Sequence, residues 1–398
     1  MTNEVKKVPE LRFPEFGGEW EEKKLGDIGS VAMNKRIYKN ETTNHGEIPF
    51  YKIGTFGKKA ETFISREKFE EYKEKYPYPN KGDILISASG SIGRTVEYDG
   101  EEAYYQDSNI VWLQHNNEVL NVFLKYFYLI VKWNGIEGTT IKRLYNKNIL
   151  NTKIELPVKE EQQKIGEFFS KLDRQIELEE QKLAKLEEQK KGYMQKIFSQ
   201  ELQFKDKITN NLDNWSEFKI KDIFSKIESG NRLPKNNLLD GDIPYVIAQT
   251  TNNGVYMNIS KDTLDYHGNN LKKFKKGSIT ISIDNPDAMF IQTHDFVTSN
   301  VMRVLYNENL SIEAHTFILY SLRKLTQTYN WSVKFSGPII MESKIKLPVK
   351  LNTNDINWNI VNKIGEFLNK LDFKIYQNTT KIELLKQRKK GLLQKMFV

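Results

Sequence analysis

Cysteine is absent from this chain of 398 residues, and histidine is scarce. The absence of thiols excludes disulfides and cysteine-based metal sites, and it fits a reducing cytoplasm. The five histidines, at positions 45, 115, 267, 294 and 315, have no second ligand at zinc spacing. The most apolar stretch, 122–131, contains Lys125 and is too short to cross a bilayer, and residues 1–16 form no apolar leader. We therefore expect a cytoplasmic protein without a membrane span or a bound metal.

The usual signatures of an enzyme are also missing. There is no phosphate-binding Gly-x-x-x-x-Gly-Lys-Ser/Thr loop, which argues against ATP hydrolysis. The nearest match to an adenine methyltransferase loop is Asp-Asn-Pro-Asp (284–287), which we interpret as a turn. Gly-Ser-Ile-Gly (90–93) is typical of a hairpin turn, and Asp83 and Asp107 lack the clustered lysine of a nuclease site. We expect the chain not to be catalytic by itself.

The charge balance is mildly basic. Lys and Arg number 60 against 52 Asp and Glu, which gives a formal net charge of +8. This balance favours a polyanionic partner over an acidic one. Many soluble proteins are equally basic, so the charge alone does not show whether the protein binds a nucleic acid.

Two long segments repeat the same apolar pattern, with steps that alternate between four and three residues. This spacing predicts two helices that wind around each other. Both segments open on Lys-Ile-Gly-Glu-Phe (164–168 and 363–367) and close on Lys-Lys-Gly (190–192 and 389–391). The first seam is Ile165, Phe169, Leu172, Ile176, Glu179, Leu183, Leu186, Lys190, Tyr193 and Ile197, and the second is Ile364, Leu368, Leu371, Ile375, Asn378, Ile382, Leu385, Lys389, Leu392 and Met396.

The remaining sequence is duplicated as well. Lys-Gly-Asp-Ile-Leu-Ile-Ser (81–87) matches Lys-Gly-Ser-Ile-Thr-Ile-Ser (276–282), and Ile-Glu-Leu-Pro-Val (154–158) matches Ile-Lys-Leu-Pro-Val (345–349). Ordered matches of this kind indicate an internal duplication. The stretches between them diverge, as in residues 33–47 against 228–242. Two copies of one scaffold with different surface loops would suit two different targets.

These observations predict an α+β chain with pseudo-twofold internal symmetry. Two mixed α/β domains alternate with two long helices, which pair as an antiparallel coiled coil because the connection 199–213 is short. We place the domains at 1–157 and 201–348 and the helices at 158–200 and 349–398. A surplus of residues near 351–358 leaves the second junction open. At about 1.5 Å per residue, the seam is about 50 Å long, or roughly fifteen base pairs.

The order of these segments resembles the specificity subunit of type I restriction–modification systems. The resemblance covers essentially the whole chain, and it rests on Pro-Glu-Phe-Gly-Gly-Glu-Trp-Glu-Glu-Lys-Lys-Leu-Gly-Asp (14–27), the Lys-Gly-Asp-Ile-Leu-Ile-Ser block, the Leu-Pro-Val helix entrance and the Gln-Lys-Ile-Phe helix exit (195–198). It implies two target recognition domains that read the two halves of a bipartite, asymmetric double-stranded DNA sequence. It also implies that the helices dock two adenine methyltransferase subunits, which use S-adenosylmethionine, and that restriction (translocase) subunits use ATP and Mg.

Basic and amide side chains in the divergent loops are the candidates for DNA contacts, since Lys and Arg suit phosphates and Arg, Asn and Gln suit base edges. Tyr38 and Tyr145 are interleaved with those of the first domain. For each residue, a solvated surface role is an equal alternative. The candidates are Lys35, Arg36, Lys39, Lys52, Arg94, Lys142 and Arg143 in the first domain, and Asn231, Arg232, Lys235, Asn236, Gln249, Asn252 and Lys334 in the second.

The polar seam positions suggest one register for the helix pair. Glu179 precedes Lys190 by the same interval as Asn378 precedes Lys389, so we predict that Glu179 pairs with Lys389. The outer faces, rich in Lys and Glu, are either solvated or partly covered by methyltransferase. Two other functions stay open: a coiled-coil scaffold that never meets DNA, and the DNA-recognition module of an ATP-independent restriction–methylation enzyme.

Overall fold

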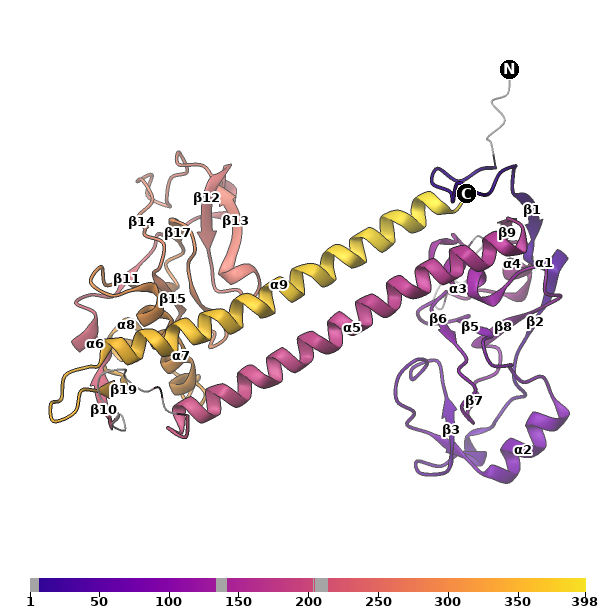
Figure 1. The fold of residues 1–398 in the computed structure, drawn as a ribbon, viewed down its shortest axis with the longest axis horizontal. Helices are drawn as coiled ribbons and strands as arrows, with labels where there is room; N and C mark the ends of the chain where they lie inside the picture. Colours follow the sequence, from indigo (N-terminus) through magenta and orange to yellow (C-terminus); the bar gives the residue numbers. More distant parts are fainter. Residues whose placement is uncertain (1–6, 134–141, 203, 205–213) are drawn as a thin grey trace, which may run out of the picture. The chain divides into compact units, whose positions relative to one another are not determined.

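The structure is a computed structural model, and it describes residues 7–133, 142–202, 204 and 214–398 (Figure 1). The chain divides into two compact units, of which the first reaches Gln181 and adds Thr380–Val398, and the second is Lys182–Thr379. Each unit holds one globular domain and parts of both long helices. Much of the predicted connection 199–213 lies outside the described residues.

The first domain is built on a four-stranded antiparallel sheet of order β2-β8-β5-β6. A smaller sheet, β4-β3-β7, and the pair β1-β9 complete it. All four residues of the central strand β5 are buried, as its run of apolar residues predicts. The strands are β1 (Glu21–Lys24), β2 (Gly29–Ala32), β3 (Ile48–Tyr51), β4 (Phe63–Ile64), β5 (Ile84–Ser87), β6 (Thr95–Glu97), β7 (Tyr104–Tyr105), β8 (Ile110–His115) and β9 (Lys153–Leu156).

Helices cover the first domain and connect its strands. The apolar stretch near 122–131 forms α3 (Asn121–Ile130), whose buried face includes Phe123, Leu124 and Tyr126. The loop at Gly90 joins the antiparallel strands β5 and β6, so the predicted hairpin turn is confirmed. The remaining helices are α1 (Leu25–Ile28), η1 (Lys39–Glu41), α2 (Arg66–Lys75) and α4 (Asn146–Leu150).

The second domain repeats this plan. Its sheet β11-β18-β15-β16 corresponds to β2-β8-β5-β6, and β10-β19 corresponds to β1-β9. A second four-stranded sheet has the order β13-β12-β17-β14. The strands are β10 (Asn214–Lys219), β11 (Glu228–Ser229), β12 (Asp240–Val246), β13 (Val255–Ile259), β14 (Lys273–Phe274), β15 (Ile279–Ser282), β16 (Met289–Ile291), β17 (Phe296–Thr298), β18 (Met302–Leu305) and β19 (Lys344–Val349). The short helices are α6 (Ile220–Ile223), η2 (Lys235–Asn237), η3 (Asn252–Gly254) and α8 (Gly337–Glu342), and the longer one is α7 (Ile312–Thr326).

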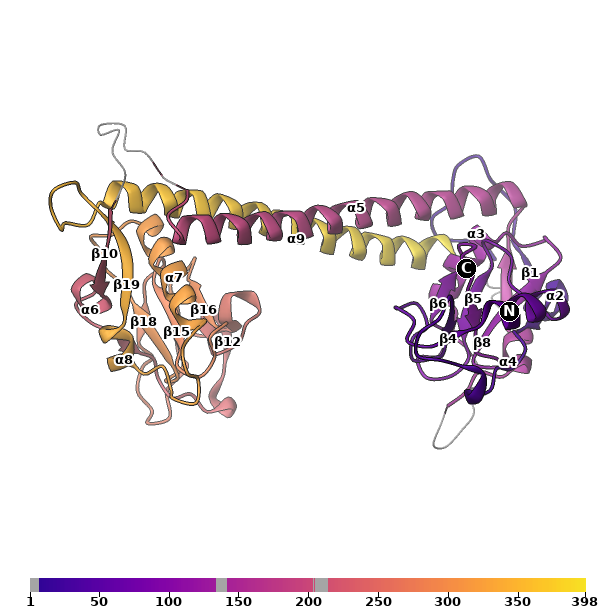
Figure 2. The ribbon, with the colours of Figure 1, turned by 90° about the horizontal axis from the view of Figure 1, so that it is seen from below.

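The two long helices are α5 (Lys159–Phe198) and α9 (Trp358–Met396), and each is continuous through both units (Figures 1 and 2). In the first unit, Ile165 and Phe169 of α5 share one core with Met396 of α9 and the residue after it, Phe397. In the second unit, Ile197 shares a core with the start of α9. The helices are therefore integral to both domains, and the predicted fold class is confirmed.

Contacts within each unit show that α5 and α9 run antiparallel. In the first unit, Asp173 pairs with Lys389 at 2.5 Å and Glu180 with Lys386 at 2.7 Å. In the second unit, Tyr193 packs edge-on against Phe367, with ring centroids 5.0 Å apart. The seam residues are buried or half-buried, except Tyr193, which is 38% exposed.

The predicted register was wrong by about one heptad. Glu179 forms its ion pair with Lys381, and Lys389 pairs with Asp173 instead. Asp173 follows the seam residue Leu172 and lies beside the seam, so a comparison of seam positions alone missed it.

The second long helix begins at Trp358, whereas the sequence boundary was placed at 349. Val349 ends strand β19 and forms a bridge with Ile356, while the Lys350 N–H donates to the Asp355 carbonyl at 2.9 Å. The surplus residues therefore close a turn onto the strand. The Asn357 side chain then accepts from the Ile360 N–H at the start of the helix.

Candidate nucleic-acid interface

The connection between β7 and β8 organises the loops of the first domain. The Gln106 side chain accepts a hydrogen bond from the Ile53 N–H at 3.0 Å, and the Ser89 hydroxyl donates to Asn109 at 2.8 Å. Ser108 adopts a positive φ of 51°, and its carbonyl accepts from the Arg143 guanidinium at 2.5 Å. Segments far apart in the sequence therefore meet at residues 106–109.

Three predicted cations lie around this connection, and a fourth, Arg94, contacts the loop that follows β3. Arg36 lies 3.9 Å from Asp107, and Arg143 binds the next residue, Ser108. Lys52 precedes Ile53, and Arg94 donates to the carbonyl of Gly57 at 3.3 Å. Arg36 nevertheless keeps 65% of its side chain exposed. Because an arginine fork has more donors than one such contact uses, these guanidinium groups can also bind a phosphate or a base edge.

Aromatic rings support several of these cations. Arg36 lies 5.7 Å from the centroid of Tyr38, and Arg143 lies 5.9 Å from that of Tyr145. Both rings are exposed, at 60% and 44%. An arginine held on an exposed ring presents a flat, charged surface to a nucleic acid.

The other first-domain candidates extend this surface. Lys35 lies 5.0 Å from the ring centroid of Tyr76, and Lys52 lies 5.9 Å from that of Phe50. Lys39 and Lys142 are exposed.

In the second domain, Asn231 holds loops together. Its Nδ2 donates to Asp265 at 2.9 Å, and its Oδ1 accepts from the Lys272 N–H at 2.8 Å. It also forms a bridge with Ser299, at the connection that corresponds to 106–109. Its side chain is thus used within the domain and is a poor candidate for reading a base.

Gln249 and Asn252 are likewise engaged within their own loop. The Gln249 Nε2 donates to the Val255 carbonyl at 2.7 Å, and the Asn252 Nδ2 donates to the same carbonyl at 3.2 Å. Asn252 has a positive φ of 48°, which an asparagine tolerates better than most residues. Both residues therefore shape the loop before β13 through bonds donated by their side-chain amides.

The charged candidates of the second domain remain accessible. Arg232 lies 4.9 Å from the ring centroid of Tyr266, which is 58% exposed. Lys235 and Asn236 are exposed on η2. Lys334 is 3.6 Å from Asp284 and corresponds to Arg143 of the first domain, because the neighbouring bonds Leu144 to Ala88 and Phe335 to Ile283 are equivalent.

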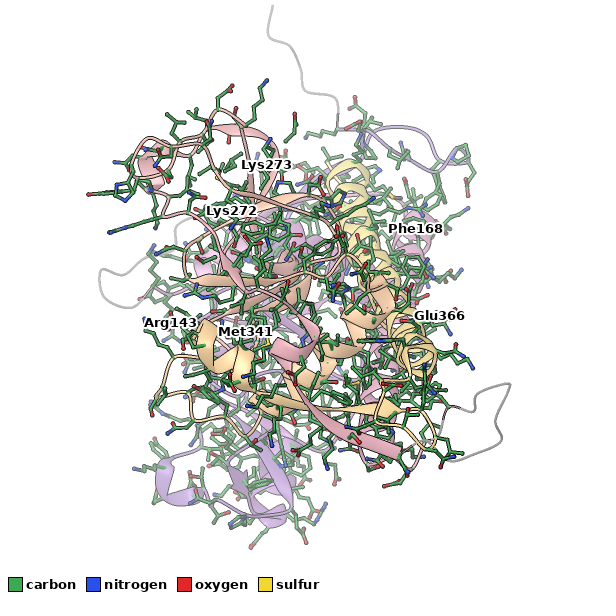
Figure 3. All side chains as sticks on the ribbon, turned by 90° about the vertical axis from the view of Figure 1, so that its left-hand side faces the viewer. Arg143, Phe168, Lys272, Lys273, Met341 and Glu366 are labelled. Carbon is green, nitrogen blue, oxygen red and sulfur yellow. The ribbon has the colours of Figure 1, made fainter. Side chains whose placement is uncertain are left out.

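Two exposed lysines in the loops around Arg232 were missed by the sequence analysis. Lys272 and Lys273, labelled in Figure 3, are exposed, and the Lys272 backbone binds Asn231. Lys272 also pairs with Glu228, whereas Lys273 begins the short strand β14. The basic run at 272–276 beside the aromatic Tyr266 was the signal that could have revealed them.

Within the residues that the structure describes, no group of three or more His, Asp or Glu side chains could hold a metal ion. Over the same residues, no helix is long and apolar enough to cross a membrane. The turn at 284–287 is stabilised by the N–H groups of Asp284 and Asn285, which donate to the Ser282 hydroxyl at 3.2 and 3.1 Å. The predicted turn is therefore confirmed.

Comparison with known proteins places this geometry in a family. The type I restriction modification DNA specificity domain matches twice, over residues 17–188 and 212–388. A putative type I restriction enzyme specificity subunit of Haemophilus influenzae is 58% identical over 150 residues, or 37% of this chain and 39% of that protein. The specificity subunit of a type II restriction enzyme of Heyndrickxia coagulans is 28% identical over 173 residues, or 43% of this chain and 47% of that protein.

These two matches span less than half the length of either relative. Among solved structures, the S subunit of a type I restriction–modification system from M. genitalium has the same fold, with a TM-score of 0.66. It is 17% identical, and the alignment covers 98% of this chain and 99% of that one. With both domains matched in sequence and the fold shared along the chain, this protein belongs to the family of type I restriction modification DNA specificity domains.

Proposed function

We propose that this chain is the DNA-reading subunit of a restriction–modification enzyme. Each domain reads one half of a bipartite, asymmetric double-stranded target, and the helix pair sets the gap between the halves. The observation that carries this proposal is the combination of equivalent scaffolds with different loops. Arg143 and Lys334 occupy equivalent positions but differ in side chain, and the loop after β11 carries Asn231, which is used within its own domain.

The two loop sets favour different half-sites. Arg36 and Arg143 of the first domain, both beside exposed tyrosines, suit phosphates or guanine edges. The second domain offers Arg232, Lys272 and Lys334 around loops shaped by amide side chains. A subunit of this kind needs no catalytic group. Methylation and cleavage belong to partner subunits, namely two methyltransferases that use S-adenosylmethionine and restriction subunits that use ATP and Mg, all in the cytoplasm.

The proposal is tested by DNA binding of the full chain together with its methyltransferase. Selection from a pool of random duplexes should enrich two short sequences at a fixed separation. The affinity should fall steeply with salt, because phosphate contacts release counterions. Enrichment of one contiguous sequence, or binding that is insensitive to salt, would overturn the proposal.

A second candidate is favoured by the type II relative. Its name identifies a specificity subunit of a type II restriction enzyme, and it matches 43% of this chain. In that alternative, the same reading subunit serves an enzyme that cleaves without ATP. Cleavage of unmethylated target DNA by the assembled enzyme, with and without ATP, separates the two candidates.

A further inference from the structure

Each globular domain touches the long helices at two repeated points. At the first point, a glycine of the Lys-Ile-Gly-Glu-Phe segment lets a domain helix approach the backbone of a long helix. A Cβ on Gly166 would lie 2.6 Å from a methyl group of Val122, at the start of α3. A Cβ on Gly365 would overlap the carbonyl oxygen of Glu313, at the start of α7.

The second point in the first unit is a cluster of three side chains from three helices. The Tyr126 hydroxyl of α3 donates to Asp173 Oδ2 of α5 at 2.9 Å, and Asp173 Oδ1 pairs with Lys389 Nζ of α9 at 2.5 Å. The Lys389 ammonium also lies 5.4 Å from the centroid of the Tyr126 ring. Tyr126 is fully buried.

The second unit contains the same cluster with the helices exchanged. The Tyr320 hydroxyl of α7 donates to Asp372 Oδ2 of α9 at 2.6 Å, and Asp372 pairs with Lys190 of α5. The Lys190 ammonium lies 4.9 Å from the centroid of the Tyr320 ring, which is buried. We call each set a Tyr–Asp–Lys clasp: Tyr126, Asp173 and Lys389 in the first unit, and Tyr320, Asp372 and Lys190 in the second.

A coiled coil alone does not need these contacts. Both lysines occupy seam positions, where a charged residue lowers the stability of the helix pair unless it is paired. The aspartate pairs with that lysine, and its second oxygen accepts from a tyrosine that belongs to the domain. Since the carboxylate is held from two directions, the clasp has its full set of bonds only at one orientation of the domain relative to both helices.

Such an orientation matters for a protein that reads two separated sites. A tilt of about 10°, carried over about 30 Å, the diameter of a small domain, displaces a loop by about 5 Å. That displacement exceeds the rise of about 3.4 Å per base pair. If the angle between a domain and the helix pair varied by this amount, the domain would therefore reach its half-site at more than one distance from the other half-site.

We propose that the two Tyr–Asp–Lys clasps are positioning devices that fix the angle between each recognition domain and the helix pair, and thereby the number of unread base pairs that the protein accepts between half-sites. This proposal rests on the proposed function. It assigns a role in the choice of DNA to six residues that lie outside the candidate DNA-binding loops.

The test uses the full chain with its methyltransferase and duplexes that carry both half-sites at the native gap, or at gaps one or two base pairs shorter or longer. Tyr320→Phe removes only a hydroxyl, and Asp372→Asn removes the charge that pairs with Lys190. In each variant, the preference for the native gap, measured as a ratio of Kd values, should fall by about tenfold, the equivalent of one charged hydrogen bond. Tyr126→Phe should have the same effect from the other unit.

Discrimination against base changes within each half-site should stay at the wild-type level in all three variants. The matched control is Glu366→Gln, labelled at α9 in Figure 3, which removes an exposed ion pair with Lys370 and should leave the gap preference unchanged. A second control is Tyr376→Phe, because Tyr376 is 67% exposed.

An unchanged gap preference in folded Tyr320→Phe and Asp372→Asn would overturn the proposal. So would an affinity that falls equally at every gap length, since that result would mean a purely structural role. If the wild-type protein itself shows no dependence on the gap, the proposed function fails instead, and the two failures can be told apart.

Discussion

Gly166 and Gly365 allow the backbone of a domain helix to touch a long helix, so a side chain at either position must displace a neighbour. We predict that Gly365→Ala lowers the free energy of unfolding by about 1–3 kcal/mol or more, as overpacking does in a filled core. The measurement is urea denaturation of the full chain. The matched control is Gly391→Ala on the same helix, where a Cβ would meet nothing within 4 Å. That change should stabilise the protein by about 0.5–1 kcal/mol. Equal stability of Gly365→Ala and the wild type would contradict the close approach.

His315 gives the second domain a predictable response to acid. Its Nδ1–H donates to the Ser311 carbonyl at 2.8 Å, its Nε2 accepts from the Asn307 N–H at 3.2 Å, and burial lowers its pKa. Because the folded pKa lies below the ordinary value of about 6.5, protonation favours the unfolded chain. The stabilisation of the folded chain by the neutral His315 imidazole is complete above about pH 6.5, and it is lost as the pH falls from there through the folded pKa.

The urea midpoint should therefore decrease between about pH 7.5 and pH 5, and His315→Gln should reduce this dependence. His45→Gln, at an exposed position, is the control and should retain the wild-type profile. Identical pH profiles for His315→Gln and the wild type would show that His315 does not cause the effect.

At this scale, the sequence identified residue types better than residue roles. Arg36 and Arg143 meet at one connection, yet Asn231, Gln249 and Asn252 hold loops of their own domain. The side-chain amides of asparagine and glutamine use the same donors and acceptors to stabilise a turn as to bind the edge of an adenine. Only the three-dimensional partners separate these two uses, and a single sequence does not contain them.

At the scale of elements, the end of α9 depends on an aromatic contact with the first domain. Phe397 stacks on Phe123 with ring centroids 4.9 Å apart and meets Trp20 edge-on at 6.3 Å. In the second unit, Phe198 makes the equivalent stack on Phe317 at 5.8 Å. We predict that Phe397→Ala costs about 3–5 kcal/mol of stability, the usual effect of removing a buried ring.

Urea denaturation monitored by circular dichroism measures this loss. Leu384→Ala, on the same helix but 60% exposed, should cost far less. A similar loss in both variants would mean that the helix contributes through its general apolar surface and not through this contact.

The long helices also show what a periodic pattern can and cannot predict. Steps of four and three residues predicted both helices, and the short connection 199–213 predicted their antiparallel pairing. The register depended on Asp173 and Asp372, which lie next to the seam and are bound by tyrosines of the domains. Tertiary contacts of this kind have no signal in the heptad pattern.

At the scale of the whole molecule, the boundary between the two units falls after Gln181 in α5 and after Thr379 in α9. An inserted heptad at each of these points preserves the seam and adds about 10 Å of helix. We predict that the target keeps both half-sites and gains about three unread base pairs. The methylated sequence of the insertion variant shows the outcome. A new base preference within a half-site would contradict the idea that the helices set the gap.

The central claim is that each domain reads its own half of the target. Its most direct test is genome-wide mapping of methylated adenines in cells that contain the methyltransferase and either the wild-type chain, the first-domain variant Arg36→Ala/Arg143→Ala, or the second-domain variant Gln249→Ala/Asn252→Ala. The wild type should methylate one bipartite, asymmetric motif with a fixed gap. Each variant should relax only the half read by its own domain, with a loss of about 1–3 kcal/mol of discrimination for each base contact that is removed or displaced. A single contiguous motif, or a variant of one domain that relaxes both halves equally, would contradict the account.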